Sequence, residues 1–425
     1  MSLIVKAGKL GKKIIKSVLP EEKKYISYTR RIERVKTGER ICAMTFDDGP
    51  FALACTPDVA QGNTLTDHLL DVLKKYDAKG TFDVIGYTGD NYPDSAGKLG
   101  TASWGGITYD HYPDINLDVH AGALNCPEHI LRMINEGHQI TNHGYRHIIF
   151  GAKPFVYGKR AYLGSLSAVL SDLQKLHSLM SEKYGYEMTM SRPPHYVDKI
   201  GDGFTSYDAY DLMGYQYLAA SFDGKGWLPS TLSDERAAYR AEVDAMVLPV
   251  KSALEQNEDF FCGQIIFQKD GYNMAKRTPV ADGLQRQLEL LSRHGYRVVT
   301  VQELMRECPF ADVDKSNPLF EKLCKMSSSR AIAYSDNTLR LDKDMTIGEL
   351  AMLLCPKENM VSYVRNLMAD NKHEHKYNIA LKYCKEAGLI PQKAKADERV
   401  TELPAQYFSK TNVKTRGEIL DAYKL

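Results

Sequence analysis

The chain has 425 residues, of which 43% are hydrophobic and 26% are charged, and its formal net charge at pH 7 is +1. This composition indicates an ordinary soluble globular protein of two or three domains. The near-zero net charge excludes any general electrostatic reason to expect nucleic acid or a membrane as the partner. The eight cysteines form no Cys-x-x-Cys pair, which argues against a cysteine zinc site and favours a reducing compartment or an anaerobic source over a disulfide scaffold.

Residues 1–40 form a basic N-terminal segment whose hydrophobic residues recur at near-helical spacing. A secretory signal needs an uninterrupted apolar core, and a transmembrane helix needs about 20 apolar residues. The segment has neither pattern, which favours a cytoplasmic or peripheral location. Two interpretations stay open, a basic helix packed on the following domain and an amphipathic helix at a membrane surface.

From residue 41 to residue 305, apolar runs alternate with segments of helical periodicity. This alternation predicts parallel strands joined by crossover helices. The predicted strands span residues 41–46, 80–85, 138–141, 187–191, 217–222, 263–268 and 297–301. The predicted helices span residues 64–76, 127–136, 159–184, 206–214, 231–256 and 280–294. The long aromatic loop at 87–127 is either a substrate-facing insertion or a surface excursion.

Two adjacent carboxylates, Asp47 and Asp48, follow the first predicted strand in the sequence TFDDGP. Parallel α/β folds carry their chemistry at the C-terminal ends of strands, and adjacent carboxylates repel each other unless a cation or a proton intervenes. His143 and His147 are four residues apart, which places both imidazoles on one side of a helical turn. Asp48, His143 and His147 are therefore candidate ligands of a divalent metal. The alternative is that both histidines are surface or capping residues.

These motifs resemble those of the polysaccharide deacetylases, the NodB-type carbohydrate esterases of family 4. The segment EGHQITNH at 136–143 and Arg-Pro-Pro at 192–194 also resemble motifs of that family, and the resemblance covers about residues 38–305. It implies a distorted (β/α) barrel of about seven parallel strands at 41–305. It also implies a hydrolase that removes acetyl groups from an N-acetylated or O-acetylated carbohydrate, with a family habit of extracellular or cell-wall location.

The resemblance implies roles for the residues of the first motifs. Asp48, His143 and His147 would hold one divalent metal ion, most simply Zn²⁺, with Co²⁺, Ni²⁺ and Mn²⁺ as alternatives. Asp47 would be the general base toward the metal-activated water that attacks the acetyl group. Arg192 would orient Asp47.

The later motifs imply supporting roles around the substrate. Asp223 would pair with Arg192, and Trp227 would form a wall of the acetyl pocket. The backbone N–H of His195 would supply half of an oxyanion hole, the metal being the other half.

Gln268 stands at the position where the family has its general-acid histidine, and an amide cannot deliver a proton. Three interpretations stay open. Asp270, Lys269 or His195 supplies the proton; the substrate is an O-acetyl ester; or the protein is a slow or inactive enzyme. In the last case the alternative function is a catalytically weakened barrel that binds cell-wall glycan.

A small, mainly helical C-terminal domain is predicted at residues 309–425. Its segments at 310–314, 334–340 and 346–350 resemble a surface-layer homology repeat. Thr415, Arg416 and Glu418 resemble the Thr-Arg-x-Glu signature of a second copy. In such repeats Thr and Arg contact a cell-wall polymer, which makes that polymer a candidate partner. The alternative is a helical domain without a ligand.

Overall fold

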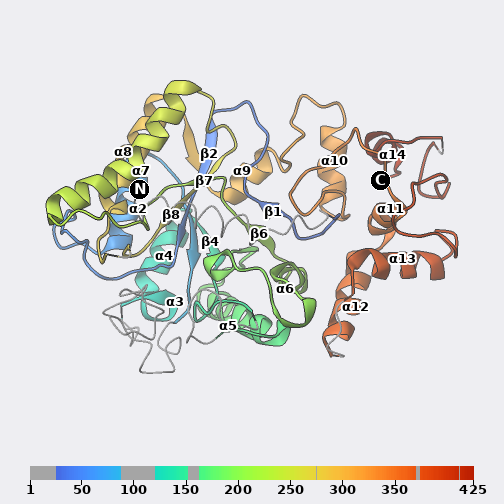
Figure 1. Cartoon of the computed structure of the whole chain (residues 1–425), viewed down its shortest axis with the longest axis horizontal. Helices are drawn as coiled ribbons and strands as arrows, with labels where there is room; N and C mark the ends of the chain where they lie inside the picture. Colours follow the sequence, from blue (N-terminus) through green and yellow to red (C-terminus); the bar gives the residue numbers. More distant parts are fainter. Residues whose placement is uncertain (1–24, 88–119, 152–161, 274, 370–373, 411) are drawn as a thin grey trace.

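The computed structural model describes residues 25–87, 120–151, 162–273, 275–369, 374–410 and 412–425 (Figure 1). Most of the predicted basic segment at 1–40 and most of the predicted long loop at 87–127 lie outside these ranges. Both interpretations of each segment therefore stay predictions. In Figure 1 the sheet and its covering helices occupy one side of the described chain, and the C-terminal helices occupy the other.

A curled sheet, parallel in all its strand pairs, forms the core of the larger part. Its strands are β1 Arg31–Ile32, β2 Ile41–Asp47, β3 Thr81–Val84, β4 Gln139–Asn142, β5 Met190–Ser191, β6 Gln216–Leu218, β7 Phe222–Asp223, β8 Ile265–Lys269 and β9 Arg297–Val299. They follow the order β1-β6-β5-β4-β3-β2-β8-β7, and β9 also pairs with β2. Among the described residues the path does not close from β7 to β1, so the sheet is an open half-barrel. The predicted parallel α/β architecture is confirmed, with nine strands where about seven were expected.

Helices cover the outer face of this sheet. They are α2 Leu65–Lys75, α3 Gly122–Asn125, α4 Pro127–Asn135, α5 Leu166–Tyr184, α6 Ser206–Met213, α7 Glu235–Gln256, α8 Val280–Arg293 and α9 Val301–Glu307. Each long helix turns an apolar face to the sheet; α2, for example, buries Leu69, Leu70 and Leu73. Thr64 caps α2 by accepting a hydrogen bond from the Asp67 backbone N–H, which starts this helix at the predicted place.

The predicted strand at 217–222 is in fact two strands at different places in the sheet. β6 pairs with β5 and β1, whereas β7 pairs with β8 at the other end of the strand order. The intervening residues 219–221 cross the open side of the half-barrel. An apolar run does not show by its periodicity where pairing stops, so sequence alone could not place this break.

Strand β2 is the centre of the sheet and ends at the candidate site. It pairs with β3, β8 and β9, and all seven of its residues are buried, which explains its nearly continuous apolar sequence. The chain then turns at Gly49, where a Cβ atom would lie 2.0 Å from Oδ2 of Asp270. Only glycine fits against that buried carboxyl without moving it.

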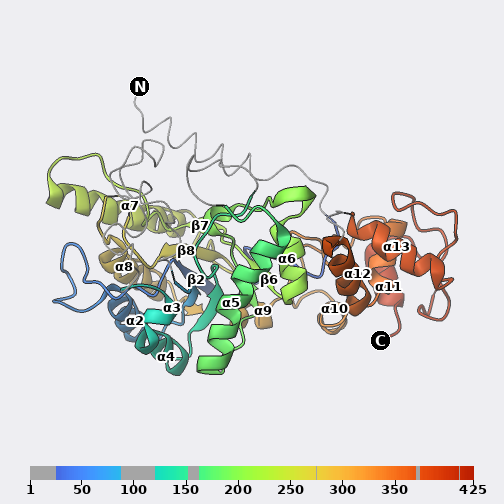
Figure 2. The ribbon, with the colours of Figure 1, turned by 90° about the horizontal axis from the view of Figure 1, so that it is seen from below.

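The C-terminal part is mainly helical, as predicted. Its helices are α10 Phe320–Ser327, α11 Ile347–Leu354, α12 Lys357–Ala369, α13 Lys376–Glu386 and α14 Arg416–Ala422, and Figure 2 shows α10 to α13 grouped beside α6. One hydrophobic core runs from sheet residues such as Ile41 and Ile265 to Phe310 and Leu350 of this part. The domain limits at 40/41 and 305/309 stay predictions. No helix in the described ranges is long and apolar enough to span a membrane.

Candidate metal centre

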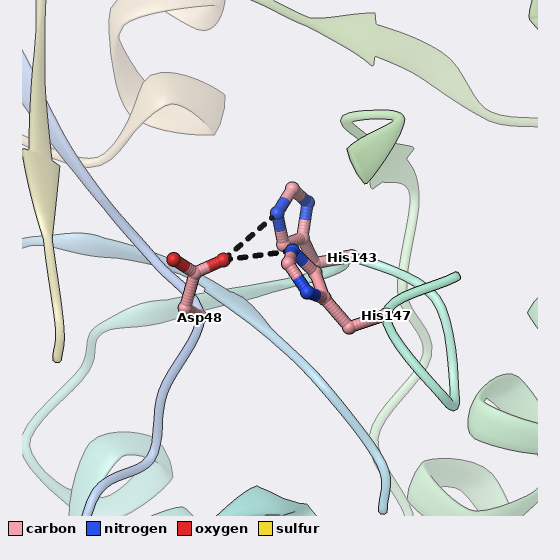
Figure 3. A group of neighbouring side chains, drawn as sticks. All are labelled: Asp48, His143 and His147. Carbon is pink, nitrogen blue, oxygen red and sulfur yellow. Dashed lines mark ion pairs between the residues drawn. The ribbon is translucent and has the colours of Figure 1, made fainter. Parts of the chain in front are cut away.

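The two histidines and one aspartate expected to bind a metal come together at the carboxyl ends of β2 and β4. Oδ1 of Asp48 lies 3.2 Å from Nε2 of His143 and 3.0 Å from Nε2 of His147 (Figure 3). All three residues are buried, with at most 5% of their surface exposed. One carboxylate oxygen and two imidazole nitrogens converge there, which is a donor set that suits zinc and related divalent cations. The group can therefore hold a divalent metal, whose identity the donor set leaves open.

The histidines meet through an irregular turn and not through the helical turn that their spacing suggested. Residues 143–147 are not helical, and the chain has positive φ at Gly144 (85°) and at His147 (53°). Asp48 also has a positive φ, of 80°. Left-handed backbone at a non-glycine residue costs free energy and occurs often at functional sites. Two of the three candidate ligands, Asp48 and His147, thus have a left-handed backbone conformation.

Asp47 is fixed beside this group by Arg192. The guanidinium of Arg192 is fully buried, pairs with Oδ1 of Asp47, and donates to Oγ1 of Thr45 at 3.1 Å and to the Leu218 carbonyl at 3.3 Å. Oδ2 of Asp47 lies 3.9 Å from Nε2 of His143. Burial raises the pKa of Asp47 to about 6, although Arg192 and His143 act in the opposite direction.

The expected contact between Arg192 and Asp223 does not form. Among the ion pairs of the described residues, Asp223 contacts Lys225 at 3.6 Å, and it accepts a hydrogen bond from Nε1 of Trp227 at 3.2 Å. The Arg192 guanidinium instead pairs with Asp47, although it lies 5.5 Å from the ring of Phe267, the β8 residue that pairs with Asp223 in register. Asp223 and Trp227 therefore form their own small group.

His195 lies close to the metal group, in the short 3-10 turn Pro194–Tyr196. Its φ is 57°, and its ring centroid is 5.6 Å from that of His147. The expected role of its backbone N–H in an oxyanion hole stays a prediction.

Gln268 lies on the opposite face of the sheet from the metal group. Its side chain is fully buried, and its Nε2 is 2.5 Å from Oε1 of Gln287 on α8. The next residue, Lys269, instead contacts Oδ2 of Asp48 through its ammonium group. Side chains alternate along a strand, and β8 pairs Lys269 with Asp47 in register. Lys269 thus occupies the inward-facing position that the sequence comparison had given to Gln268, because a shift of one residue reverses the face.

Sequence reasoning overlooked Asp83 on β3. Its side chain is fully buried, and its Oδ2 lies 2.7 Å from Nδ1 of His143. A signal was present, because a carboxylate in the middle of the buried strand Thr81–Val84 is unusual and needs a partner. Burial by itself would lower the pKa of His143, but Asp83, Asp48 and Asp47 together raise it well above its ordinary range.

In the C-terminal part, the residues expected to contact a cell-wall polymer have internal partners. The Thr415 side chain caps α14, accepting a hydrogen bond from the Glu418 backbone N–H. The buried guanidinium of Arg416 donates to the carbonyls of Leu339 and Ile332 and lies 3.1 Å from the Glu349 carboxylate. Both side chains therefore serve the packing of this part.

Comparison with models of known protein families gives a match within the half-barrel. Residues 34–199 match the polysaccharide deacetylase family. The match does not reach the C-terminal part, so it lends no support to surface-layer homology repeats there.

Individual proteins show the same similarity. The peptidoglycan-N-acetylglucosamine deacetylase of Bacillus cereus is 26% identical over 274 residues, which cover 64% of this chain and 91% of that protein. The enzyme of the same description from Listeria monocytogenes is 23% identical over 303 residues, 71% of this chain but 46% of that protein. The chitin deacetylase structure from Colletotrichum lindemuthianum is 20% identical with a TM-score of 0.42, covering 68% of this chain and 95% of that one.

Proposed function

We propose, on the premise that residues 34–199 form a polysaccharide deacetylase domain, that this chain is a metal-dependent hydrolase of acetylated carbohydrate. The observation that carries the proposal is the convergence of Asp48, His143 and His147 with Asp47 beside them. The two bacterial relatives named above are described as peptidoglycan-N-acetylglucosamine deacetylases, which supports an N-acetylated cell-wall glycan as the substrate class.

Asp47 is the residue assigned to the general base. A divalent cation held by the three ligands would polarise the acetyl carbonyl and lower the pKa of the attacking water. Arg192 occupies Oδ1 of Asp47, which leaves Oδ2, on the side of His143, to accept the proton from that water. A pKa raised to about 6 suits this role, because a general base works best when its pKa lies close to the operating pH.

Lys269 is the residue assigned to the proton donor for the leaving amine. Of the three candidates, it is the one whose charged group contacts Asp48. Both carboxylate oxygens of Asp270 lie 2.8 Å from Oγ1 of Thr66, outside the metal group. The ring of His195 lies against His147. General acid catalysis is typically worth about 10²–10⁴-fold, so Lys269→Met should slow amide hydrolysis more than ester hydrolysis.

A glycan-binding function is the second candidate, and one observation favours it. The Lys269 ammonium contacts the Asp48 carboxylate, which is the same group that would bind the metal. In addition, β8 ends in Gln268 and Lys269, so it offers no histidine to the site. A cation beside the ligand carboxylate opposes metal binding. This function predicts glycan binding without turnover.

The test is acetate release by the purified protein in the presence of Zn²⁺ or a chelator. The substrates are acetylated chito-oligosaccharides, peptidoglycan fragments and O-acetyl esters. We expect chelator-sensitive release from an amide substrate, and Asp47→Asn should abolish it while Zn²⁺ still binds. Release from esters alone would make the protein an esterase. Bound Zn²⁺ without any release would reject the hydrolase and leave the glycan-binding function.

A further inference from the structure

Asp83 stands next to His143 on the side away from Asp48. The register of the sheet puts Asp83 directly between Asp47 on β2 and Thr141 on β4. Its Oδ1 accepts a hydrogen bond from Oγ1 of Thr141 at 2.5 Å, and its Oδ2 lies 2.7 Å from Nδ1 of His143. The carboxylate is therefore held in place at one oxygen, while the other makes a close charge contact with the imidazole but no hydrogen bond.

The surroundings of His143 determine which ring nitrogen carries the hydrogen. Nδ1 faces two acceptors, Oδ2 of Asp83 at 2.7 Å and the Arg192 carbonyl at 2.9 Å. Nδ1 donates its hydrogen bond to the Arg192 carbonyl and so keeps its hydrogen whether the ring is charged or neutral, and Nε2 is the nitrogen that can lose its proton and bind a metal. Nε2 is the atom that faces Oδ1 of Asp48 at 3.2 Å.

A purely structural role would not explain a charge at this position. Asp83 is fully buried on a strand whose four residues are all buried. Burying a carboxylate costs several kcal/mol unless it is paired, and an apolar side chain of similar volume packs at least as well. Arg192 is already paired with Asp47, so the imidazole of His143 is the basic group that Asp83 contacts directly, beside the neutral hydroxyl of Thr141.

We propose that Asp83 is a positioning residue that fixes the orientation and tautomer of His143 and thereby sets the affinity of the metal centre. This inference rests on the proposed function, because it requires that Asp48, His143 and His147 bind a divalent metal. Carboxylates that hold metal-binding histidines typically contribute 10- to 100-fold to metal affinity. Asp83 is not one of the three ligands in this proposal and would act through His143.

The experiment measures Zn²⁺ affinity by chelator competition and the Co²⁺ absorption spectrum, using the full-length protein and its Asp83→Asn and Asp83→Leu variants. We expect Zn²⁺ affinity to fall about 10- to 100-fold in Asp83→Asn and at least as far in Asp83→Leu, with a changed Co²⁺ spectrum. Asp211→Asn is the matched control, because Asp211 is a buried aspartate that pairs with Lys376 and does not belong to the candidate metal group. It should lower stability and leave Zn²⁺ affinity unchanged.

Each other result has a defined meaning. A folded Asp83→Asn protein with Zn²⁺ affinity within twofold of the wild type would overturn the inference and leave the proposed function intact. The Asp48→Asn variant, which lacks a ligand, serves as the reference for absent Zn²⁺ binding. A wild-type protein that binds Zn²⁺ no better than this variant would overturn both the inference and the proposed function. If the Asp83 variants do not fold, the Zn²⁺ affinity of Thr141→Val tests the inference instead. This variant keeps the Asp83 carboxylate but removes the hydrogen bond from Thr141 that holds the carboxylate in place. It should weaken Zn²⁺ binding more than twofold, and an unchanged affinity would overturn the inference.

Discussion

Asp47 and Asp48 are adjacent in the sequence yet both face the same centre. Successive side chains of a strand point to opposite faces, so two inward-facing neighbours require a break in the strand. Asp47 is the last residue of β2, and Asp48 follows with a φ of 80°. Aspartate tolerates this left-handed region better than most residues. Because of this turn, Asp47 contacts Arg192, whereas Asp48 contacts the two histidines and Lys269.

Asp270 gives a prediction about stability and pH. It is fully buried, and burial raises its pKa from the ordinary value of 3.8 to about 7. A carboxyl with a higher pKa in the folded protein favours folding while it is protonated. Its contribution is therefore complete below about pH 4 and is lost as the pH rises through about 7. We expect the stability advantage of Asp270→Asn over the wild type to grow by about 2–3 kcal/mol from pH 5 to pH 8.

The measurement is urea unfolding of both proteins at pH 5 and pH 8 with chelator present, so that metal binding does not contribute. Thr66 should keep its partner, because asparagine retains one acceptor oxygen for the Thr66 hydroxyl. An equal difference in unfolding free energy at the two pH values would show that Asp270 is ionised in the folded protein throughout this range.

The sequence was sufficient to find the metal group with Asp47 and Arg192 beside it, but not the places of Asp83 and Lys269. Asp48, His143 and His147 lie in short motifs whose residue types and spacing are visible without the fold. The role of Asp83 depends on which strand lies beside β4, and that of Lys269 on which face of β8 points inward. Those facts are set by strand pairing, which is not local in the sequence.

At the level of elements, alternation of apolar runs and helical periods was enough to predict the parallel sheet and its covering helices. The six predicted helices of the barrel region have counterparts in α2, α4, α5, α6, α7 and α8. β1 was not predicted, because its two residues lie in a basic segment and become a strand only by pairing with β6. Short edge strands have little local signal, and tertiary pairing decides them.

Lys376 at the start of α13 gives a prediction at this scale. Its buried ammonium pairs with Asp211 and lies 3.7 Å from Asp208, both on α6. Thr29 also donates to Asp211, from its N–H at 3.0 Å and its hydroxyl at 2.5 Å. Removing one partner of a buried ion pair leaves a charge uncompensated, so Lys376→Met should lower the unfolding free energy by about 3–5 kcal/mol.

Denaturant unfolding checks this value, with the exposed Lys382 of the same helix as the matched control. Lys382→Met should change the unfolding free energy by less than about 0.5 kcal/mol. The double variant Lys376→Met, Asp211→Leu should recover part of the loss, because it also removes the buried carboxylate that pairs most closely with the Lys376 ammonium. A loss below about 1 kcal/mol in Lys376→Met would mean that α13 does not depend on this ion pair.

At the scale of the whole molecule, the sheet has two hydrophobic cores with different partners. One lies between the strands and the helices α2 to α8. The other joins Ile41, Ile265 and Val299 at the N-terminal part of the sheet to apolar residues of the C-terminal part, such as Phe310 and Leu323. The candidate metal centre lies at the opposite, carboxyl ends of the strands. The C-terminal part therefore supports the fold from the side away from the chemistry.

This arrangement predicts the effect of removing residues 309–425. The sheet residues of the second core would be exposed to water, and burial of apolar surface is worth about 25 cal/mol per Å². We expect a chain that ends at residue 308 to have a lower Tm than the full chain and to bind a hydrophobic dye, while its folded fraction keeps full Zn²⁺ affinity. Calorimetry of the full chain should show one cooperative transition, because the shared core couples the two parts. Two separate transitions, or an unchanged Tm after truncation, would instead mean that the parts fold independently and that the predicted boundary near residue 309 separates autonomous domains.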